Sequence, residues 1–217
     1  MPIRVFLADD HAVVRDGLRF ILENQGDISV VGEAADGRMT VREVQRLRPD
    51  VVIMDIAMPE LNGIEATQQV RDACPSTQVV ILSMHASVEH IFRALQAGAR
   101  GYLLKESAGK EVVEAVRAVS TSRRYLSEGI SETILDEFTR TDRAAHGKSP
   151  LESLSTRERE ILQLVVEGKS SAEIAEVLRI SPKTVETYRS RLMQKLGLSD
   201  LPSLVKFAIQ HGLTPLK

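Results

Sequence analysis

Five short runs of aliphatic and β-branched residues alternate with five segments of helical periodicity over the first 120 residues. The intervening segments place their apolar residues three or four positions apart, which is typical of helices with one buried face. Strands that alternate with helices pair in parallel, because each helix returns the chain to the same edge of the sheet. The strand-like runs lie at 3–8, 28–34, 51–55, 78–84 and 101–105. This pattern predicts an α/β domain, and continuously apolar runs such as VVIMD indicate a doubly wound parallel sheet covered on both faces.

The last part of the chain has only helical signals. A short helix, a tight turn and a longer cationic helix follow one another there, which is the order of a helix-turn-helix. Helix-capping residues divide the segment into four helices. The expected signals are Ser155 with Glu158 and then Gly168 for the first helix, Ser171 for the second, Ser181, Pro182 and Gly197 for the third, and Gly212 for the end of the fourth.

Charge separates these parts. Residues 1–120 have a net charge of −4 and residues 151–217 a net charge of +2, while 121–150 are neutral. We therefore expect a domain over 1–120, a linker with a short helix near 127–138 over 121–152, and a second, all-α domain over 153–217. A net charge of +2 alone would not indicate DNA binding.

The composition excludes several classes of protein. One cysteine, Cys74, cannot form an intramolecular disulfide or a cysteine-based metal site. No apolar run approaches the roughly 20 residues of a membrane helix, and the N-terminal residues lack the pattern of a signal peptide. We expect a cytoplasmic protein with no membrane partner.

Acidic residues stand at the ends of two of the expected strands. Asp9 and Asp10 end the first and Asp55 ends the third. In a flavodoxin-like sheet of order 2-1-3-4-5, both ends lie at the point where strand order reverses, and ligands bind there. Three carboxylates at one place repel one another, and oxygen ligands of this kind suit Mg²⁺.

Two further strand ends add a hydroxyl and a cation. Ser83 follows the fourth strand, and Lys105 follows the fifth and can bind a phosphoryl oxygen. Asp55, which ends a central strand, is the candidate nucleophile for an aspartyl phosphate. Each residue alone has a structural alternative, because a strand-terminal Asp often caps the next helix. The combination favours phosphoryl chemistry.

These motifs resemble the receiver domain of two-component response regulators over residues 1–120. The residues that carry the resemblance are Asp9 and Asp10, Asp55 followed by MPELNG, Ser83, Tyr102 and Lys105. The resemblance implies that Asp55 accepts the phosphoryl group, that Asp10, Asp55 and the Ala57 carbonyl bind Mg²⁺ directly and Asp9 binds it through water, that Ser83 and Lys105 assist catalysis, and that Ser83 and Tyr102 form a switch pair.

Some residues of this domain remain open to other interpretations. Tyr102 could be a half-buried strand residue. His11 and His85 are interpreted as structural or solvent-facing residues. Glu106 stands where many receivers have a proline after the lysine. Because a cis bond to Glu costs about 3 kcal/mol, we expect a trans peptide there.

Residues 153–212 resemble the four-helix DNA-binding domain of the NarL/LuxR type, on the segments LSTREREIL and GKSSAEIAEVLRISPKTVETYRSRLMQKLG. Helix 182–196, with a net charge of +3, is expected to enter the major groove. The expected base-facing residues are Glu186, Thr187 and Ser190, and the expected phosphate contacts are Lys183, Thr184, Tyr188, Arg191 and Lys195. A solvated surface charge is the alternative for any one cation.

The whole chain is therefore identified as a response regulator of the NarL/FixJ family and not as an enzyme. A sensor histidine kinase is the expected phosphodonor, and double-stranded DNA and a second copy of the chain are the expected partners. The resemblance places the dimer contact on helix 200–211, although its Leu204, Val205, Ala208 and Ile209 could simply pack inside the domain.

The sequence leaves three other functions open. One is a small phosphatase or phosphotransferase with Asp55 as nucleophile. The others are a regulator whose first domain only dimerises, and a helix-turn-helix that contacts protein. Turnover of an external phosphoester and the salt dependence of binding would discriminate among them.

Overall fold

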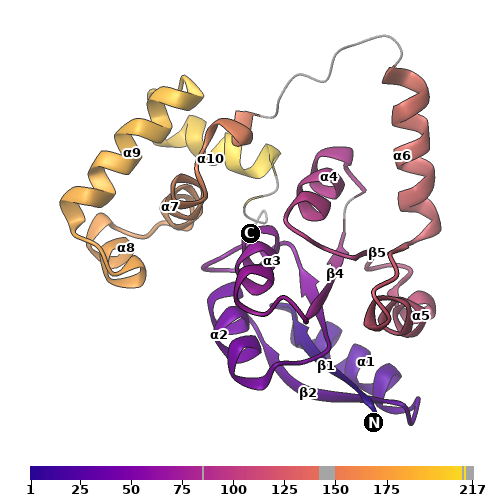
Figure 1. Ribbon diagram of the computed structural model, residues 1–217. Coiled ribbons are helices and arrows are strands. Elements are labelled where there is room, and N and C mark those ends of the chain that lie inside the picture. Colours follow the sequence, from indigo (N-terminus) through magenta and orange to yellow (C-terminus); the bar gives the residue numbers. More distant parts are fainter. Residues whose placement is uncertain (85, 142–149, 212, 214–217) are drawn as a thin grey trace. The chain divides into compact units, whose positions relative to one another are not determined.

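The structure is a computed structural model that describes residues 1–84, 86–141, 150–211 and 213. These residues form two compact units, one built chiefly from residues 1–141 and the other chiefly from residues 150–213. Each unit has its own hydrophobic core. Figure 1 shows the helices and strands of both units along the chain.

The first unit is built on a parallel sheet with the strand order β2-β1-β3-β4-β5-β6. The strands are β1 (Ile3–Ala8), β2 (Ile28–Ala34), β3 (Val51–Asp55), β4 (Gln78–Ser83), β5 (Gly101–Leu104) and β6 (Tyr125–Leu126). The expected order 2-1-3-4-5 and the bounds of five strands are confirmed to within a residue. Strand order reverses beside β1, between β1 and β3, so the carboxyl ends of these two strands lie at the switch point.

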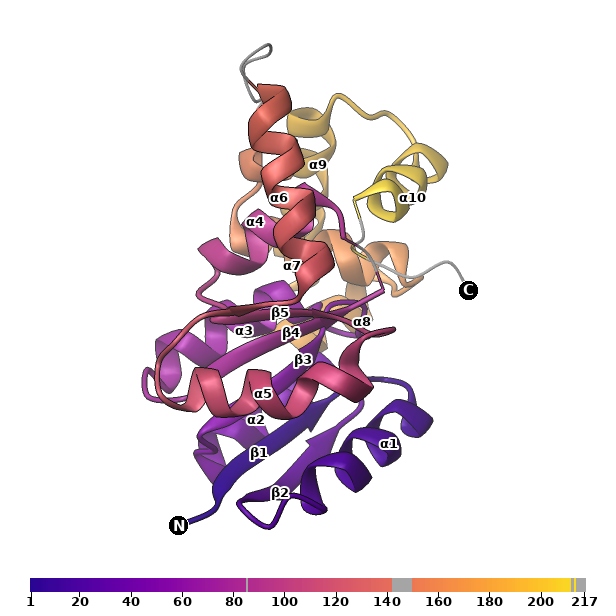
Figure 2. The same ribbon diagram turned by 90° about the vertical axis from the view of Figure 1, so that its right-hand side faces the viewer.

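Helices cover both faces of this sheet, as expected for buried parallel strands. Helices α1 (Ala12–Glu23) and α5 (Ala108–Ser120) lie on one face, and α2 (Gly37–Leu47) and α3 (Gly63–Ala73) on the other, with α4 (Val88–Gln96) beside α3 (Figure 2). The side chains of β1 alternate accordingly. Val5 and Leu7 join the core under α1 and α5, whereas Phe6 lies on the side of Leu47 of α2.

The segment after α5 contains a strand that the sequence pattern did not indicate, followed by the helix that was expected near 127–138. Tyr125 and Leu126 form the sixth strand beside β5, and the amide of Ser127 donates to the carbonyl of Tyr102 (3.1 Å). Helix α6 (Glu128–Thr141) then packs against β5 and α4, with Ile130 fully buried. Part of the expected linker 121–152 therefore belongs to the first unit.

The second unit is entirely helical within the described residues. A 3₁₀ turn (Pro150–Ser153) precedes α7 (Thr156–Val166), α8 (Ser171–Leu178), α9 (Pro182–Leu196) and α10 (Leu201–Gln210). The core joins Ile161 and Leu162 of α7, Ile174 of α8, Val185 and Leu192 of α9, and Leu204 and Ala208 of α10. The expected apolar side of the third helix is confirmed.

The helix ends match the sequence signals with one correction. Ser155 and Glu158 form a capping box, Ser181 caps α9 with Pro182 in its first turn, and Gly197 ends α9 with a φ of 66°. Ser170, and not Ser171, caps α8, because Ser170 pairs with Glu173 in a second capping box. The expected end at Gly212 lies outside the described residues.

Glu158 joins the capping box of α7 to helix α9. Its Oε2 accepts hydrogen bonds from the Ser155 amide (2.7 Å) and from Nζ of Lys195 (2.7 Å). Burial acts to raise the pKa of Glu158, but these bonds outweigh it and hold the pKa below its ordinary value of 4.5.

The first prediction concerns the stability of this unit. Because the folded-state pKa of Glu158 is lowered, its contribution is fully present above pH 4.5 and is lost as the pH falls through the folded value. We expect Glu158→Gln to destabilise the unit by about 1–2 kcal/mol at pH 7. This difference should shrink below pH 4.5. Urea unfolding followed by NMR signals from α7 and α9 measures it, and a difference independent of pH contradicts the role assigned to the carboxylate.

Candidate functional site

The structure gathers the acidic residues of β1 at the carboxyl edge of the sheet. Asp9 follows β1 and is only 1% exposed, and its amide bonds to the carbonyl of Ala34 (3.2 Å) beside it on β2. Asp10 is half-buried in the loop that leads into α1. The predicted proximity of Asp9, Asp10 and Asp55 is confirmed, since one oxygen from each lies within 4.8 Å of the others.

Lys105 connects the two buried carboxylates of this edge. Its Nζ lies 2.7 Å from Oδ2 of Asp55 and 2.8 Å from Oδ2 of Asp9, and its side chain is 10% exposed. The amide of Lys105 bonds to the carbonyl of Ser83 (2.8 Å), so β4 fixes the point at which the lysine leaves β5. The peptide bond to Glu106 is trans, as expected.

The electrostatics of this cluster follow from burial and charge. Burial raises the pKa of Asp55, and the neighbouring Asp9 carboxylate raises it further, while Lys105 acts in the opposite direction. Burial acts to lower the pKa of Lys105, but Asp55 and Asp9 outweigh it and raise the pKa above its ordinary value. Lys105 therefore stays an ammonium group, and one positive charge faces two buried carboxylates.

The cluster fits a hard divalent cation. Oδ2 of Asp9 and Oδ1 of Asp10 are buried atoms, and they lie 2.8 Å from Nζ of Lys105 and 2.7 Å from Nδ1 of His11, respectively. Carboxylate oxygens with spare lone pairs are the ligands that Mg²⁺ prefers, and a cation would reduce the repulsion between Asp9 and Asp55. The donor set is therefore of the kind that the sequence predicted.

Ser83 and Tyr102 lie on neighbouring strands beside the carboxylates. Both are buried, with exposed fractions of 3% and 0%. Burial raises the pKa of Tyr102 to about 12, and a hydrogen bond with the Ser83 side chain acts against the increase. Asp55 also contributes to this pKa, so the phenol lies within its electrostatic reach. Tyr102 is therefore fully buried and not half-buried, and its role in a switch pair stays a prediction.

The loop after Asp55 packs tightly against it. The Ala57 amide faces Oδ1 of Asp55 at 3.4 Å, and Asn62 caps α3 through its side-chain oxygen. A Cβ atom built on Gly63 would lie 1.9 Å from the carbonyl oxygen of Asp55. Only glycine allows α3 to begin so close to the end of β3.

Two residues near the site were not assigned a role from the sequence. Arg15 donates from a guanidinium nitrogen to the Asp9 carbonyl (2.6 Å), and its side chain is 15% exposed. The sequence signal that could have pointed to Arg15 is its charge at a position between the apolar Val14 and Leu18 of the same helix. His11, interpreted as structural or solvent-facing, is 64% exposed in its side chain but lies 2.7 Å from Oδ1 of Asp10. His85 lies outside the described residues.

The second candidate site is the outer face of α9. Lys183, Glu186, Thr187, Ser190 and Arg191 are exposed, whereas Thr184 and Tyr188 are half-buried. Glu186 contacts Ser171 of α8 and lies 3.9 Å from Arg189, and Arg189 also donates to Ser171 (3.1 Å). These polar contacts fix α9 against α8 at the base of the helix-turn-helix.

Lys195 differs from the other cations of α9. It is exposed, but its ammonium is paired with Glu158 of α7. This ion pair competes with any contact to a DNA phosphate.

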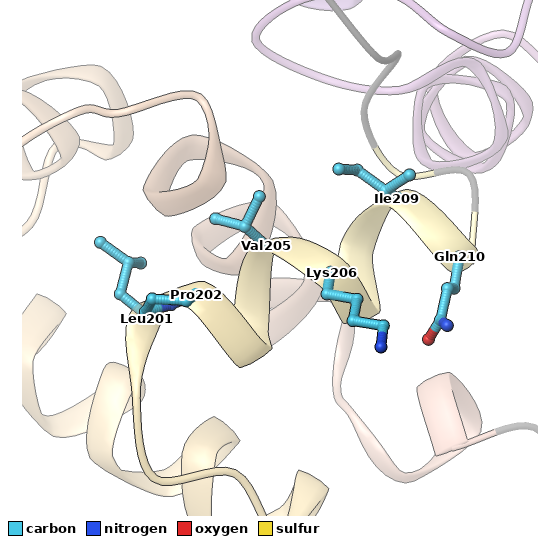
Figure 3. Close-up of a pocket in the computed structure, with 6 residues that line it drawn as sticks. All are labelled: Leu201, Pro202, Val205, Lys206, Ile209 and Gln210. Atoms are coloured by element: carbon cyan, nitrogen blue, oxygen red, sulfur yellow. The ribbon is translucent and has the colours of Figure 1, made fainter.

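Helix α10 has two apolar faces. Leu204 and Ala208 pack into the core, which confirms the packing alternative for these two residues. Figure 3 shows the other side chains along the helix, where a shallow apolar pocket is lined by Leu201, Pro202, Val205, Lys206, Ile209 and Gln210. Val205 and Ile209 therefore line this pocket, whereas Leu204 and Ala208 are buried in the core.

The chain matches two protein-family models. Residues 5–117 match the response regulator receiver domain, and residues 152–208 match the bacterial regulatory proteins of the luxR family. The oxygen regulatory protein NreC of Staphylococcus epidermidis is 39% identical over 215 residues, which cover 97% of this chain and 99% of NreC.

Solved structures agree with these matches. A LuxR-family two-component response regulator from Aurantimonas sp. SI85-9A1 has a TM-score of 0.62 and 36% identity, covering 64% of this chain and 99% of that chain. The response regulator RcsB in complex with DNA has a TM-score of 0.59 and 26% identity, covering 95% of this chain and 98% of that chain.

The chain belongs to the two-component response regulators with a LuxR-type DNA-binding domain. It is a phosphorylation-dependent regulator of transcription, and its family consists of transcription regulators and not of enzymes. None of the helices in the described ranges has the length and apolar character that a bilayer crossing requires.

A second prediction follows from the loop after Asp55. Gly63→Ala forces a methyl group onto the Asp55 carbonyl, so we expect a loss of about 2–4 kcal/mol of unfolding free energy and a displaced site. Gly17→Ala is the matched control, because outside its own helix backbone and chain neighbours nothing lies within 4 Å of the added methyl group. Thermal unfolding and phosphate incorporation measure both variants. Equal behaviour of the two variants would contradict the packing argument.

Proposed function

We propose that Asp55 is the phosphoacceptor through which this regulator is switched. The observation that carries the proposal is the buried Asp55 carboxylate at the carboxyl edge of the sheet, held 2.7 Å from Nζ of Lys105 and next to Asp9. A nucleophilic carboxylate beside cationic groups that can neutralise an incoming phosphoryl group is the arrangement that phosphoryl transfer requires.

The transfer itself needs a phosphodonor with a good leaving group. An oxygen of Asp55 attacks the phosphorus of a phosphohistidine on a sensor kinase, or of a small donor such as acetyl phosphate. The P–N or P–O bond to the donor breaks, the imidazole or acetate leaves with the electron pair, and an acyl phosphate forms on Asp55. Lys105, already an ammonium group, stabilises the charge on the phosphoryl oxygens.

Four residues of this chain would hold Mg²⁺. They are Asp10, Asp55 and the carbonyl of Ala57 as direct ligands and Asp9 through a water molecule. When bound, the cation supplies positive charge that stabilises the phosphoryl oxygens and relieves the repulsion between the carboxylates. The proximity of the Asp9, Asp10 and Asp55 carboxylates, with one oxygen of each within 4.8 Å of the others, supports this assignment.

We assign the response to phosphorylation to Ser83 and Tyr102. The Ser83 hydroxyl can donate to a phosphoryl oxygen on Asp55, and a Ser83 that turns toward this oxygen gives up its hydrogen bond with Tyr102. Phosphorylation would thus change the packing around a fully buried aromatic ring, which shifts the balance between two existing states of the domain.

The second unit would bind double-stranded DNA with α9 in the major groove. Glu186, Thr187 and Ser190 would face base edges, and Lys183, Thr184, Tyr188 and Arg191 would contact phosphates. The exposure of Lys183 and Arg191 supports this division. Lys195 is the weakest member of the predicted set, since its partner Glu158 would have to release it.

A homodimer is the proposed active form on DNA. The outer face of α10, with Leu201, Val205 and Ile209, offers apolar area for the contact. NreC is named for oxygen regulation. In this chain the stimulus would be set by the partner kinase.

The third prediction tests the phosphoacceptor. With acetyl phosphate and Mg²⁺, the wild type should take up one phosphoryl group per chain and shift toward a dimer. Asp55→Asn should do neither, because an amide oxygen is a poor nucleophile. Asp16→Asn, at an exposed position of α1, is the control and should behave as the wild type. Intact-mass spectrometry and sedimentation measure the two effects. Uptake by Asp55→Asn at the wild-type stoichiometry would show that another residue is the acceptor.

The fourth prediction tests the DNA contacts. Lys183→Ala and Arg191→Ala should each weaken binding to all sequences and reduce the slope of log K against log salt by about 0.9. Glu186→Gln should change the preference at one base pair by about 1–3 kcal/mol and leave the slope unchanged. Lys110→Ala, an exposed cation of α5, is the control. Slopes identical to the wild type in Lys183→Ala and Arg191→Ala would exclude α9 as the phosphate-binding element.

A further inference from the structure

Arg15 reaches from the first turn of α1 to the backbone at the end of β1. Its Nη1 donates to the carbonyl oxygen of Asp9 at 2.6 Å, and its side chain is only 15% exposed. A hydrogen bond from a charged guanidinium to a carbonyl is shorter and stronger than one between neutral groups. The bond therefore ties the start of α1 to the strand end that carries two of the three carboxylates.

The backbone of Asp9 is held at both of its polar groups. Its amide donates to the carbonyl of Ala34 on β2 (3.2 Å), and its carbonyl accepts from Arg15. That carbonyl and the amide nitrogen of Asp10 belong to one planar peptide unit. A rotation of this plane changes the direction in which the Asp10 side chain leaves the backbone. Arg15 therefore fixes how the Asp10 carboxylate is placed relative to that of Asp9.

Glu33 of β2 holds the guanidinium near this carbonyl. Its Oε1 lies 3.8 Å from Nε of Arg15, and that nitrogen is a buried atom. Glu33 directly precedes Ala34, whose carbonyl accepts from the Asp9 amide. Strand β2 thus supports the end of β1 in two ways, through its own backbone and through the Glu33 and Arg15 side chains.

A second arginine of α1 shares Glu33 but has a different set of partners. Arg19 lies one helical turn after Arg15, and its guanidinium is 2.8 Å from Oε2 of Glu33 and 3.5 Å from Oε1 of Glu23. Among the described residues, the Arg19 guanidinium is bonded to carboxylates alone. The two arginines thus share a helix and a partner carboxylate, and they differ in the bond to the Asp9 carbonyl.

We propose that Arg15 is a positioning residue for phosphoryl transfer. By holding the Asp9 carbonyl, it orients the peptide between Asp9 and Asp10 and so pre-arranges the carboxylates that would bind Mg²⁺. The inference rests on the proposed function, in which Asp10 and Asp55 bind the cation and Asp55 accepts the phosphoryl group. Residues that orient metal ligands without touching the metal affect its affinity strongly.

The direction of the effect separates this role from that of a charge. The Arg15 guanidinium brings positive charge toward the acidic cluster, so by charge alone its removal would tighten the binding of a cation. If Arg15 acts by placing the carboxylates, its removal weakens cation binding instead. At saturating Mg²⁺ the bound cation itself orders the carboxylates, and the rate of transfer should then recover.

The experiment compares Arg15→Gln with Arg19→Gln in the full-length chain. Titration calorimetry measures Mg²⁺ binding without a phosphodonor. Intact-mass spectrometry follows phosphoryl uptake from acetyl phosphate over a range of Mg²⁺ concentrations and gives the half-saturating Mg²⁺ concentration and the limiting rate. The ¹⁵N amide signal of Asp10 reports on the peptide in the metal-free chain, and unfolding curves check that each variant is folded.

We expect Arg15→Gln to weaken Mg²⁺ binding and to raise the half-saturating Mg²⁺ concentration about tenfold. The limiting rate should change by less than about twofold, because the missing interaction is replaced once the cation is bound. The Asp10 amide signal should shift in Arg15→Gln. Arg19→Gln should match the wild type in all three measurements.

Unchanged or tighter Mg²⁺ binding in Arg15→Gln would overturn the inference, and so would an equal loss of affinity in Arg19→Gln. If Arg15→Gln does not fold, the same criteria apply to Arg15→Lys, which keeps the charge on a chain one bond shorter. Failure of the proposed function gives a different result. In that case Asp10→Asn binds Mg²⁺ as tightly as the wild type, or Asp55→Asn takes up a phosphoryl group. If both of those variants fail as proposed while Arg15→Gln behaves as the wild type, only the role of Arg15 is wrong.

Discussion

One ammonium group holds two buried carboxylates together, and the first unit is arranged around that interaction. Asp9, Asp55 and Lys105 come from the ends of β1, β3 and β5, and residues 5–8, 51–55 and 101–103 of these strands are buried. Like charges at this separation are unfavourable in a buried place, so a single Lys105 leaves the cluster short of positive charge. Because the cluster has less positive than negative charge, it favours the binding of a cation or of a group that is bound together with a cation. Stability and phosphoryl chemistry therefore depend on the same charges.

Most of this arrangement could be predicted from the sequence because it follows from periodicity. Parallel strands bring their carboxyl ends to one edge, so residues at the end of each apolar run must meet. Asp9, Asp55 and Lys105 were assigned in this way, and the resemblance to receivers added Tyr102. Three helix ends of the second unit could be predicted in the same way, because the capping residues Ser155, Ser181 and Gly197 act through local backbone geometry.

Two of the features that were missed, strand β6 and the pairing of Lys195, depend on contacts between residues distant in the sequence, whereas the cap of α8 is local. Strand β6 has two residues, too few for a pattern of alternation, and is defined by its hydrogen bonds to β5. Ser170 and Ser171 are both capable caps, and the choice between them was decided by Glu173. The cation of Lys195 looked available on the helical face, but the partner that occupies it, Glu158, lies 37 residues away in the sequence. Periodicity on one helix carries no information about such partners.

In helix α9, some side chains hold the helix in the second unit and others form the face that is expected to bind DNA. Val185 and Leu192 anchor the helix in the core, and Lys195 ties it to α7 through Glu158. Glu186 and Arg189 both contact Ser171, so the face expected to read DNA is also the face that joins α9 to α8. A base that donates a hydrogen bond to the Glu186 carboxylate must therefore compete with the Ser171 hydroxyl. Sequence preference at that position should depend on the stability of the α8–α9 contact as well as on the base itself.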